Sequence, residues 1–86
     1  MFSVYVLISE SCEKTYAGQT KDRTARLDTH NSGKVRSTKR CRPWRLLYYE
    51  ECETRAEAIQ RELWFKSRSG RKKILEIIEG EKKKRR

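Results

Sequence analysis

The segment at residues 2–8 constrains the fold most strongly, because it is apolar on two faces at once. It reads FSVYVLI, and alternate residues of a strand point to opposite sides of a sheet. One face carries a phenylalanine, two valines and an isoleucine, and the other carries Tyr5, Leu7 and a serine. We therefore expect an interior strand that is covered on both sides, in which the Tyr5 hydroxyl needs a hydrogen-bond partner.

A second strand is predicted at residues 15–18, after a polar turn at residues 9–14. The pattern indicates a hairpin that brings Tyr5 and Tyr16 into one neighbourhood. Gly18 is expected to turn the chain out of this strand, since glycine adopts backbone conformations that other residues avoid.

The next segment carries the signals of a helix. Thr20 or Asp22 can act as the N-cap, and Asn-Ser-Gly at residues 31–33 supplies the end, where glycine can take the left-handed conformation. Arg26 and His30 stand four residues apart and therefore share one face of this helix. A guanidinium and an imidazole placed together suit an anionic substrate better than a protein core.

Residues 34–45 form a basic segment that reads KVRSTKRCRPWR. Its six cations are Lys34, Arg36, Lys39, Arg40, Arg42 and Arg45. The segment is either a solvated surface loop or a loop that contacts phosphate groups, and its place after the Arg26/His30 helix favours phosphate contact. A third strand is predicted at residues 44–50, and its first residue, Trp44, either stacks on a base or belongs to the core.

The later part of the chain is predicted to be helical. Thr54 and Glu57 fit the capping box that begins a helix running to about Ser67. Its inward stripe is predicted to hold Ala58, Ile59, Glu62, Leu63, Phe65 and Lys66. Glu62 is the unusual member, since a carboxylate among apolar side chains needs a cation. That cation is either a metal ion or an arginine in a structural salt bridge.

A break at Ser69 and Gly70 is expected to precede a last helix at residues 71–79, which Gly80 ends. Residues 1–80 would then form one domain, and residues 81–86, EKKKRR, a disordered basic tail.

The net charge narrows the classes of function. The 86 residues include 22 Lys and Arg against 12 Asp and Glu, a formal net charge of +10. So large a positive charge on a small domain creates an electrostatic field that attracts polyanions, of which nucleic acid is the commonest. The alternatives are a basic protein that is merely soluble and a ribosome-associated protein.

The cysteines argue against a zinc site. There are three, no two form a CxxC pair, and the chain has one histidine. This pattern is typical of a reducing cytoplasm. No signal-peptide pattern opens the sequence, and no apolar run approaches the roughly 20 residues that span a membrane. We therefore expect a soluble intracellular protein without a membrane partner.

Together these residues resemble the GIY-YIG endonuclease domain, most nearly its small stand-alone bacterial members. The resemblance covers Phe2 to about Ile78. Its motifs are Tyr5, Tyr16-Ala17-Gly18, Arg26, His30-Asn31-Ser32-Gly33, Arg42-Pro43-Trp44 and Glu62. The sequence departs from the two motifs that give the family its name. Val4 stands where the first motif has isoleucine and has no glycine before it, and Ala17 replaces the isoleucine of the second motif.

The resemblance implies an α+β fold, a three-stranded and mainly antiparallel sheet flanked by helices. It also implies a divalent-metal-dependent endonuclease that hydrolyses DNA, with one Mg²⁺ or Mn²⁺ ion on Glu62. Tyr5 or Tyr16 would act as the base or position the water, Arg26 would bind the phosphate and His30 would assist. The expected nucleic-acid contacts are Lys34, Arg36, Lys39, Arg40, Arg42 and Lys66.

A tyrosine base meets an energetic difficulty. A free phenol titrates near pH 10, so a base at pH 7 requires about 4 kcal/mol of preferential stabilisation of the phenolate. The metal ion and Arg26 could supply part of this. We therefore favour Tyr5 as a hydroxyl that positions water, and the alternative is that both tyrosines are core residues. The alternative function is a non-catalytic DNA- or RNA-binding module on the same fold.

Overall fold

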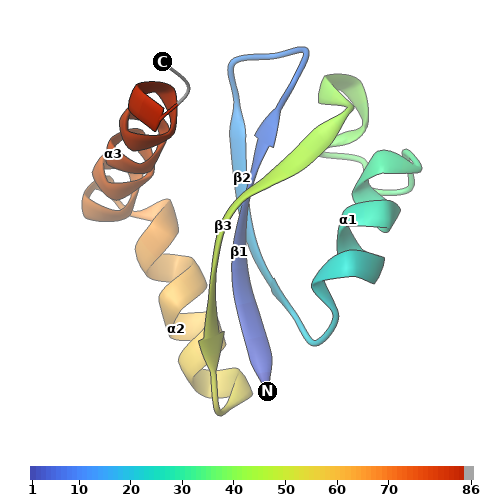
Figure 1. Cartoon of the computed structure of the whole chain (residues 1–86). Helices are drawn as coiled ribbons and strands as arrows, with labels where there is room; N and C mark the ends of the chain where they lie inside the picture. The colour runs from blue at the N-terminus through green and yellow to red at the C-terminus, as the bar shows by residue number, and fades with distance from the viewer. Residues whose placement is uncertain (85–86) are drawn as a thin grey trace.

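Three strands form one antiparallel sheet in the order β2-β1-β3 (Figure 1). The computed structural model describes residues 1–84, so residues 85–86 lie outside the described part. The strands are β1 (Phe2–Ser9), β2 (Thr15–Thr20) and β3 (Trp44–Cys52). The expected interior strand is therefore β1, which pairs on both edges, and the hairpin of β1 and β2 is confirmed.

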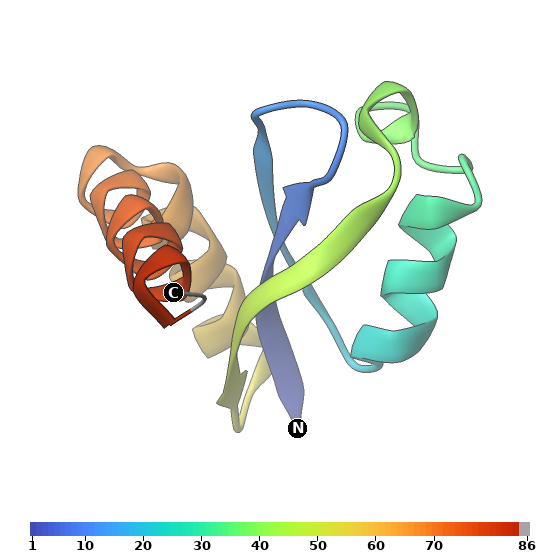
Figure 2. The ribbon, with the colours of Figure 1, turned by 45° about the horizontal axis from the view of Figure 1, so that its top comes forward.

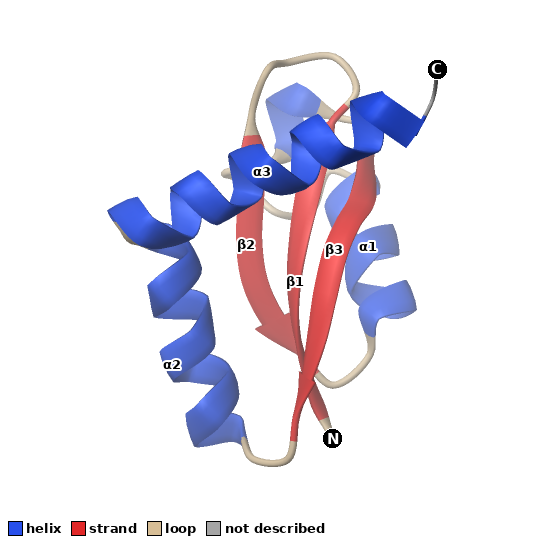
Figure 3. Cartoon of the chain, turned by 60° about the vertical axis from the view of Figure 1, so that its left-hand side comes forward, coloured by secondary structure: helices blue, strands red, loops and turns tan. Residues whose placement is uncertain are grey.

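Helices cover both faces of the sheet. They are α1 (Arg23–Asn31), α2 (Arg55–Lys66) and α3 (Arg68–Lys84), with a short 3-10 turn η1 (Lys39–Cys41) before β3. In Figures 1 and 2, α1 lies on one side of the sheet, and α2 and α3 lie on the other. Figure 3 shows α3 crossing the strands while α1 lies behind them. This arrangement confirms the α+β fold. Within residues 1–84, none of these helices is both long and apolar enough to cross a membrane.

The alternation in β1 divides the core into two parts. Val4 and Val6 pack with Phe65 and Ile74 under α2 and α3. Tyr5 faces the α1 side, in a second cluster that also holds Leu7, Cys41 and Trp44. A sheet buried on both faces explains why apolar residues occupy both faces of β1 and why its serines, Ser3 and Ser9, are buried as well.

Local signals predicted several boundaries correctly. Asp22 is the N-cap of α1, and its Oδ1 accepts a hydrogen bond from the Ala25 amide at 3.0 Å. Gly33 has a φ of +84° after the helix ends, which is the left-handed conformation expected there. Thr54 caps α2 and accepts from the Glu57 amide at 3.2 Å.

Two glycine predictions were wrong. Gly18 does not turn the chain, because β2 continues to Thr20 and Gly18 pairs with Tyr5 inside the sheet. Gly70 does not break a helix either: it lies buried in the first turn of α3, where a Cβ atom would overlap with the Trp64 carbonyl and the Phe65 Cα of α2. Both glycines are needed for close packing rather than for a turn.

The end of the last helix also differs from the prediction. Gly80 does not end α3, which continues to Lys84. The Arg45 guanidinium donates to both carboxylate oxygens of Glu81, so the segment at 81–84 is a helical turn tied to β3 rather than a disordered tail. The rest of the predicted tail, residues 85–86, lies outside the described residues.

The predicted inward stripe of α2 is only partly correct. Ala58 and Phe65 are buried, whereas Ile59 is 42% exposed and Leu63 is 56% exposed. The stripe is displaced because α2 contacts the sheet along the Ala58/Phe65 line, which leaves Glu62 at the edge of the buried surface.

Candidate active site

Tyr5 lies at the centre of the sheet, with its ring directly over Gly18 of β2. The two residues are register partners, and a Cβ atom on Gly18 would lie 2.5 Å from the Tyr5 hydroxyl oxygen. The glycine therefore provides the space into which the phenol extends. Tyr16, also on β2, has its ring centroid 6.4 Å from that of Tyr5, as the hairpin predicted.

The Tyr5 hydroxyl is held between Arg26 and His30, the two side chains of α1 that the sequence predicts at the site. Arg26 Nε donates to it at 3.4 Å, and His30 Nε2 lies 3.0 Å from it. The His30 side chain is completely buried, and its ring centroid lies 4.8 Å from that of Tyr16. The spacing of Arg26 and His30 along α1 thus directs both side chains to one hydroxyl.

His30 has a second partner that the sequence did not point to. Its Nδ1 lies 2.8 Å from the Thr38 hydroxyl oxygen, and the Thr38 side chain is 1% exposed. Thr38 lies inside the segment predicted to be a basic phosphate-binding loop. No local pattern distinguishes it, because the contact joins two elements that pack only in the folded chain.

Burial shifts the pKa values of Tyr5 and His30 in opposite directions. It raises the pKa of Tyr5 above its ordinary value of 10.0, and the hydrogen bond from Arg26 opposes this only in part. It lowers the pKa of His30 below 6.5, and the positive charge of Arg26 lowers it further. At neutral pH the site therefore holds a protonated phenol beside a neutral imidazole.

Glu62 extends from α2 toward this cluster. Burial is the main cause of the raised pKa of Tyr5, and the negative charge of Glu62 is the smallest of the influences that add to it. Glu62 Oε2 pairs with Lys66 Nζ at 2.8 Å, and Lys66 also lies 5.9 Å from the centre of the Tyr16 ring. The expected cation is thus present as a lysine one turn along α2, rather than as an arginine.

Comparison with known protein families identifies the family of this chain. The sequence model of the GIY-YIG catalytic domain matches residues 1–74. The chain belongs to the GIY-YIG nuclease family. No solved structure matches it at a significant level.

Small bacterial proteins are similar to this GIY-YIG chain. A UPF0213 protein of Bacillus pumilus is 49% identical over 65 residues, and the UPF0213 protein YazA of Bacillus subtilis is 45% identical over 65 residues. Each alignment covers 74% of this chain and 66% of the relative, slightly less than two thirds of its length. A UPF0213 protein of Streptococcus pyogenes is 41% identical over 76 residues, covering 86% of this chain and 83% of the relative.

The basic segment of this GIY-YIG domain is mostly exposed. Its exposed cations are Lys34, Arg36, Lys39, Arg40 and Arg42. Within residues 1–84, none of these side chains forms a hydrogen bond or ion pair with Tyr5 or Glu62. Thr38 is the member of the segment that connects it to His30. Arg45 instead forms ion pairs with Glu10 and Glu81.

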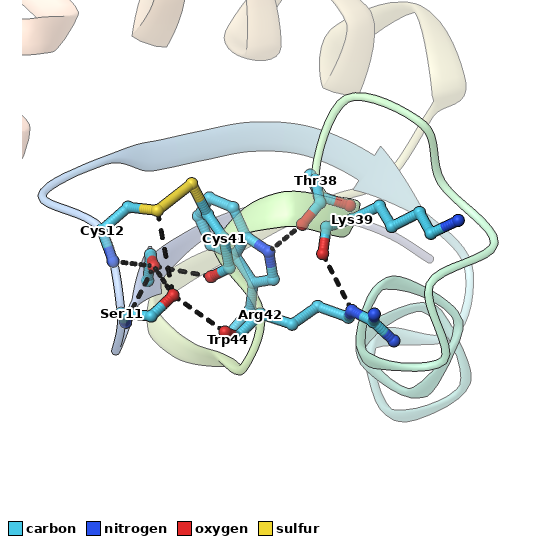
Figure 4. The surroundings of a disulfide bond; sticks show 8 residues. Ser11, Cys12, Thr38, Lys39, Cys41, Arg42 and Trp44 are labelled. Atoms are coloured by element: carbon cyan, nitrogen blue, oxygen red, sulfur yellow. Dashed lines mark hydrogen bonds between the residues drawn. A yellow bond between two sulfur atoms is a disulfide. The ribbon is translucent and has the colours of Figure 1, made fainter.

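The 3-10 turn η1 is attached to the rest of the molecule at several points (Figure 4). A disulfide joins Cys12, in the β1–β2 turn, to Cys41 in η1, a pairing that the cysteine pattern did not predict. Trp44 is 5% exposed and donates from Nε1 to the Thr38 carbonyl at 2.8 Å. Trp44 is therefore a core residue, and the alternative of base stacking was wrong.

The residues at the site fit a hard divalent cation that is held mainly by water and substrate oxygens. Glu62 offers one carboxylate, and within residues 1–84 no group of three His, Cys, Asp or Glu side chains gathers to hold a metal. Mg²⁺ commonly keeps several waters and uses one or two carboxylates together with substrate phosphates. A structural zinc site needs four protein ligands, which this arrangement does not supply.

Proposed function

We propose that this chain is a divalent-metal-dependent endonuclease that hydrolyses DNA phosphodiester bonds. The observation that supports this most directly is the Tyr5 hydroxyl held between Arg26 and His30 on a GIY-YIG fold. Hydrolysis of a phosphodiester requires a positioned water, neutralisation of charge on the phosphate and stabilisation of the leaving oxygen. The residues in and beside this cluster can serve each of these needs.

Arg26 is the proposed phosphate ligand. Its Nε donates to Tyr5, and a guanidinium carries further N–H donors on its terminal nitrogens that can reach the non-bridging oxygens. A guanidinium donates more strongly as charge builds up on those oxygens, so this contact strengthens in the transition state.

Tyr5 is the proposed hydroxyl that positions and deprotonates the attacking water. Its raised pKa means that Tyr5 is not ionised to a phenolate at neutral pH in the free protein. A concerted transfer avoids that state: the water gives a proton to the Tyr5 oxygen while the Tyr5 proton moves to His30 Nε2. The oxygen that leaves phosphorus takes a proton from solvent, and His30 later returns its proton by the same route.

Glu62 is the residue proposed to hold the metal ion. When bound, one Mg²⁺ or Mn²⁺ ion would polarise the phosphate or stabilise the leaving oxygen. The Lys66 side chain is half-exposed, so the lysine can move from the carboxylate to a phosphate oxygen at small cost.

The proposed nucleic-acid contacts are Lys66 and the exposed cations of the basic segment, Lys34, Arg36, Lys39, Arg40 and Arg42. Because the substrate is DNA, we propose that the protein acts at the nucleoid, in the cytoplasm. A non-catalytic DNA- or RNA-binding module is the second candidate. It is favoured by the Glu62–Lys66 pair, which already supplies the carboxylate with a cation.

The test is a cleavage assay in Mg²⁺ or Mn²⁺ on duplex, nicked, branched and single-stranded DNA and on RNA. We expect Glu62→Gln to lower the cleavage rate by orders of magnitude. The pair with Lys66 is worth at most about 1 kcal/mol, so the melting temperature should change little. Glu76→Gln, an exposed change on α3, is the matched control and should cleave like the parent.

Two outcomes would contradict the proposal. Equal cleavage rates for the parent and Glu62→Gln would show that Glu62 does not hold the catalytic metal ion. Tight DNA binding by the parent without cleavage of any substrate would favour the binding module.

A further inference from the structure

Both ring nitrogens of His30 have a buried hydrogen-bond partner. His30 is 0% exposed and Thr38 is 1% exposed, so water does not compete for either hydrogen bond. Nε2 faces the Tyr5 hydroxyl at 3.0 Å, and Nδ1 faces the Thr38 hydroxyl at 2.8 Å. A neutral imidazole carries one proton, so one nitrogen donates and the other accepts.

The two ends of this chain of hydrogen bonds favour one direction for its protons. At one end, the Thr38 hydroxyl donates to the Val35 carbonyl at 3.3 Å, and a carbonyl can only accept. In that arrangement the Thr38 oxygen accepts from His30 Nδ1–H at 2.8 Å. At the other end, Arg26 Nε can only donate to Tyr5, and in the same arrangement the Tyr5 hydroxyl donates to His30 Nε2.

The position of Thr38 is held by groups outside the site. Its carbonyl accepts from Trp44 Nε1 at 2.8 Å and from the Cys41 amide at 3.3 Å (Figure 4). Its own amide donates to the Val35 carbonyl at 3.1 Å. With its backbone held on both sides, the Thr38 side chain has little freedom to turn away from His30.

We propose that Thr38 is a positioning residue that keeps His30 in the tautomer protonated on Nδ1, so that Nε2 accepts the Tyr5 proton. The catalytic consequence rests on the proposed nuclease function. In this tautomer the Tyr5 hydrogen points inward, and an oxygen lone pair of Tyr5 is left for the proton of the attacking water. In the other tautomer His30 donates to Tyr5, and the Tyr5 hydrogen turns toward the substrate, where it cannot take up a proton from water.

The tautomer can be measured without any substrate. His30 is the only histidine among the 86 residues, so the imidazole nitrogens give one set of ¹⁵N NMR signals. In the parent protein we expect a proton on Nδ1 and a lone pair on Nε2. Thr38→Ser keeps the hydroxyl and should retain this pattern, whereas Thr38→Val removes it and should shift the population toward Nε2–H.

The cleavage assay then tests the consequence. Loss of the productive tautomer should lower the rate for Thr38→Val by about 10²-fold or more, while DNA binding stays within about twofold. Thr38→Ser should restore most of the rate. A lower melting temperature for Thr38→Val is expected from the lost buried hydrogen bond and does not count as support.

Other results would overturn the proposal. A parent protein with its proton on Nε2 would refute it, and this measurement needs no mutant that might fail to fold. A folded Thr38→Val protein that keeps the Nδ1 proton would refute it equally. If no nucleic acid is cleaved, the nuclease proposal fails while the NMR result still decides the role of Thr38.

Discussion

Reduction of the Cys12–Cys41 disulfide should destabilise this small domain strongly. The bond closes a segment whose ends are 29 residues apart, which includes β2, α1 and residues 34–41 of the basic segment. In the chain-entropy description, opening a loop of 29 residues costs about 3.6 kcal/mol at 25 °C. For 86 residues this corresponds to a fall of about 20 °C in melting temperature.

The assay is thermal and urea unfolding of the oxidised and reduced protein in a Cys52→Ser background. Cys52 is the one free cysteine among the described residues, and replacing it prevents exchange with the disulfide. Alkylation followed by mass spectrometry confirms the oxidation state of each sample. A double Cys12→Ser, Cys41→Ser variant should match the reduced protein.

A fully oxidised sample whose urea midpoint equals that of the reduced sample would refute the reasoning. It would mean that the other contacts between the β1–β2 turn and η1, such as Ser9 Oγ to the Cys41 carbonyl at 2.6 Å, already hold the loop. The comparison matters for the proposed cytoplasmic location, because thiols are kept reduced there.

Four further predictions concern the site. Gly18→Ala should displace the Tyr5 ring and destabilise the fold by about 1–3 kcal/mol, measured by urea unfolding, and a neutral result would mean that the ring moves freely. Arg26→Ala should lower the cleavage rate far more than DNA affinity, whereas equal losses would make Arg26 an ordinary binding residue. Binding should weaken with salt at a log–log slope of about −0.9 per phosphate neutralised. A variant with serine at three positions should flatten that slope if the basic segment contacts phosphates. The three positions are Lys39, Arg40 and Arg42. Because the pKa of His30 is lowered in the folded state, the unfolded state takes up the proton first, and stability should fall as the pH drops below about 6.5. A His30→Asn variant should lack that part of the pH dependence.

Features that depend on neighbours in the chain could be predicted. The capping side chains of Asp22 and Thr54 act on amides three residues away, and Gly33 ends α1 by its own backbone conformation. The alternation in β1 predicted a strand covered on both faces, because strand geometry alone decides which side chains share a face.

The candidate site was only partly predictable. Arg26 and His30 were predicted to lie together because residues four apart share one face of a helix. Tyr5 and Tyr16 were predicted to lie near each other because a hairpin pairs their two strands. The Thr38 contact to His30 was missed, since a threonine in a basic loop carries no local signal. Metal binding by Glu62 and phosphate contact by the basic segment stay predictions.

By itself, the sequence determined the order of the elements, the caps that begin α1 and α2, and the face of α1 that Arg26 and His30 share. The tertiary structure alone decided that Gly18 and Gly70 serve close packing, that Cys12 pairs with Cys41, and that Lys66 is the cation beside Glu62. The physical reason is the range of the interactions. Caps and helix faces depend on residues within one turn, whereas these contacts depend on how the sheet, its helices and the loop before β3 pack together.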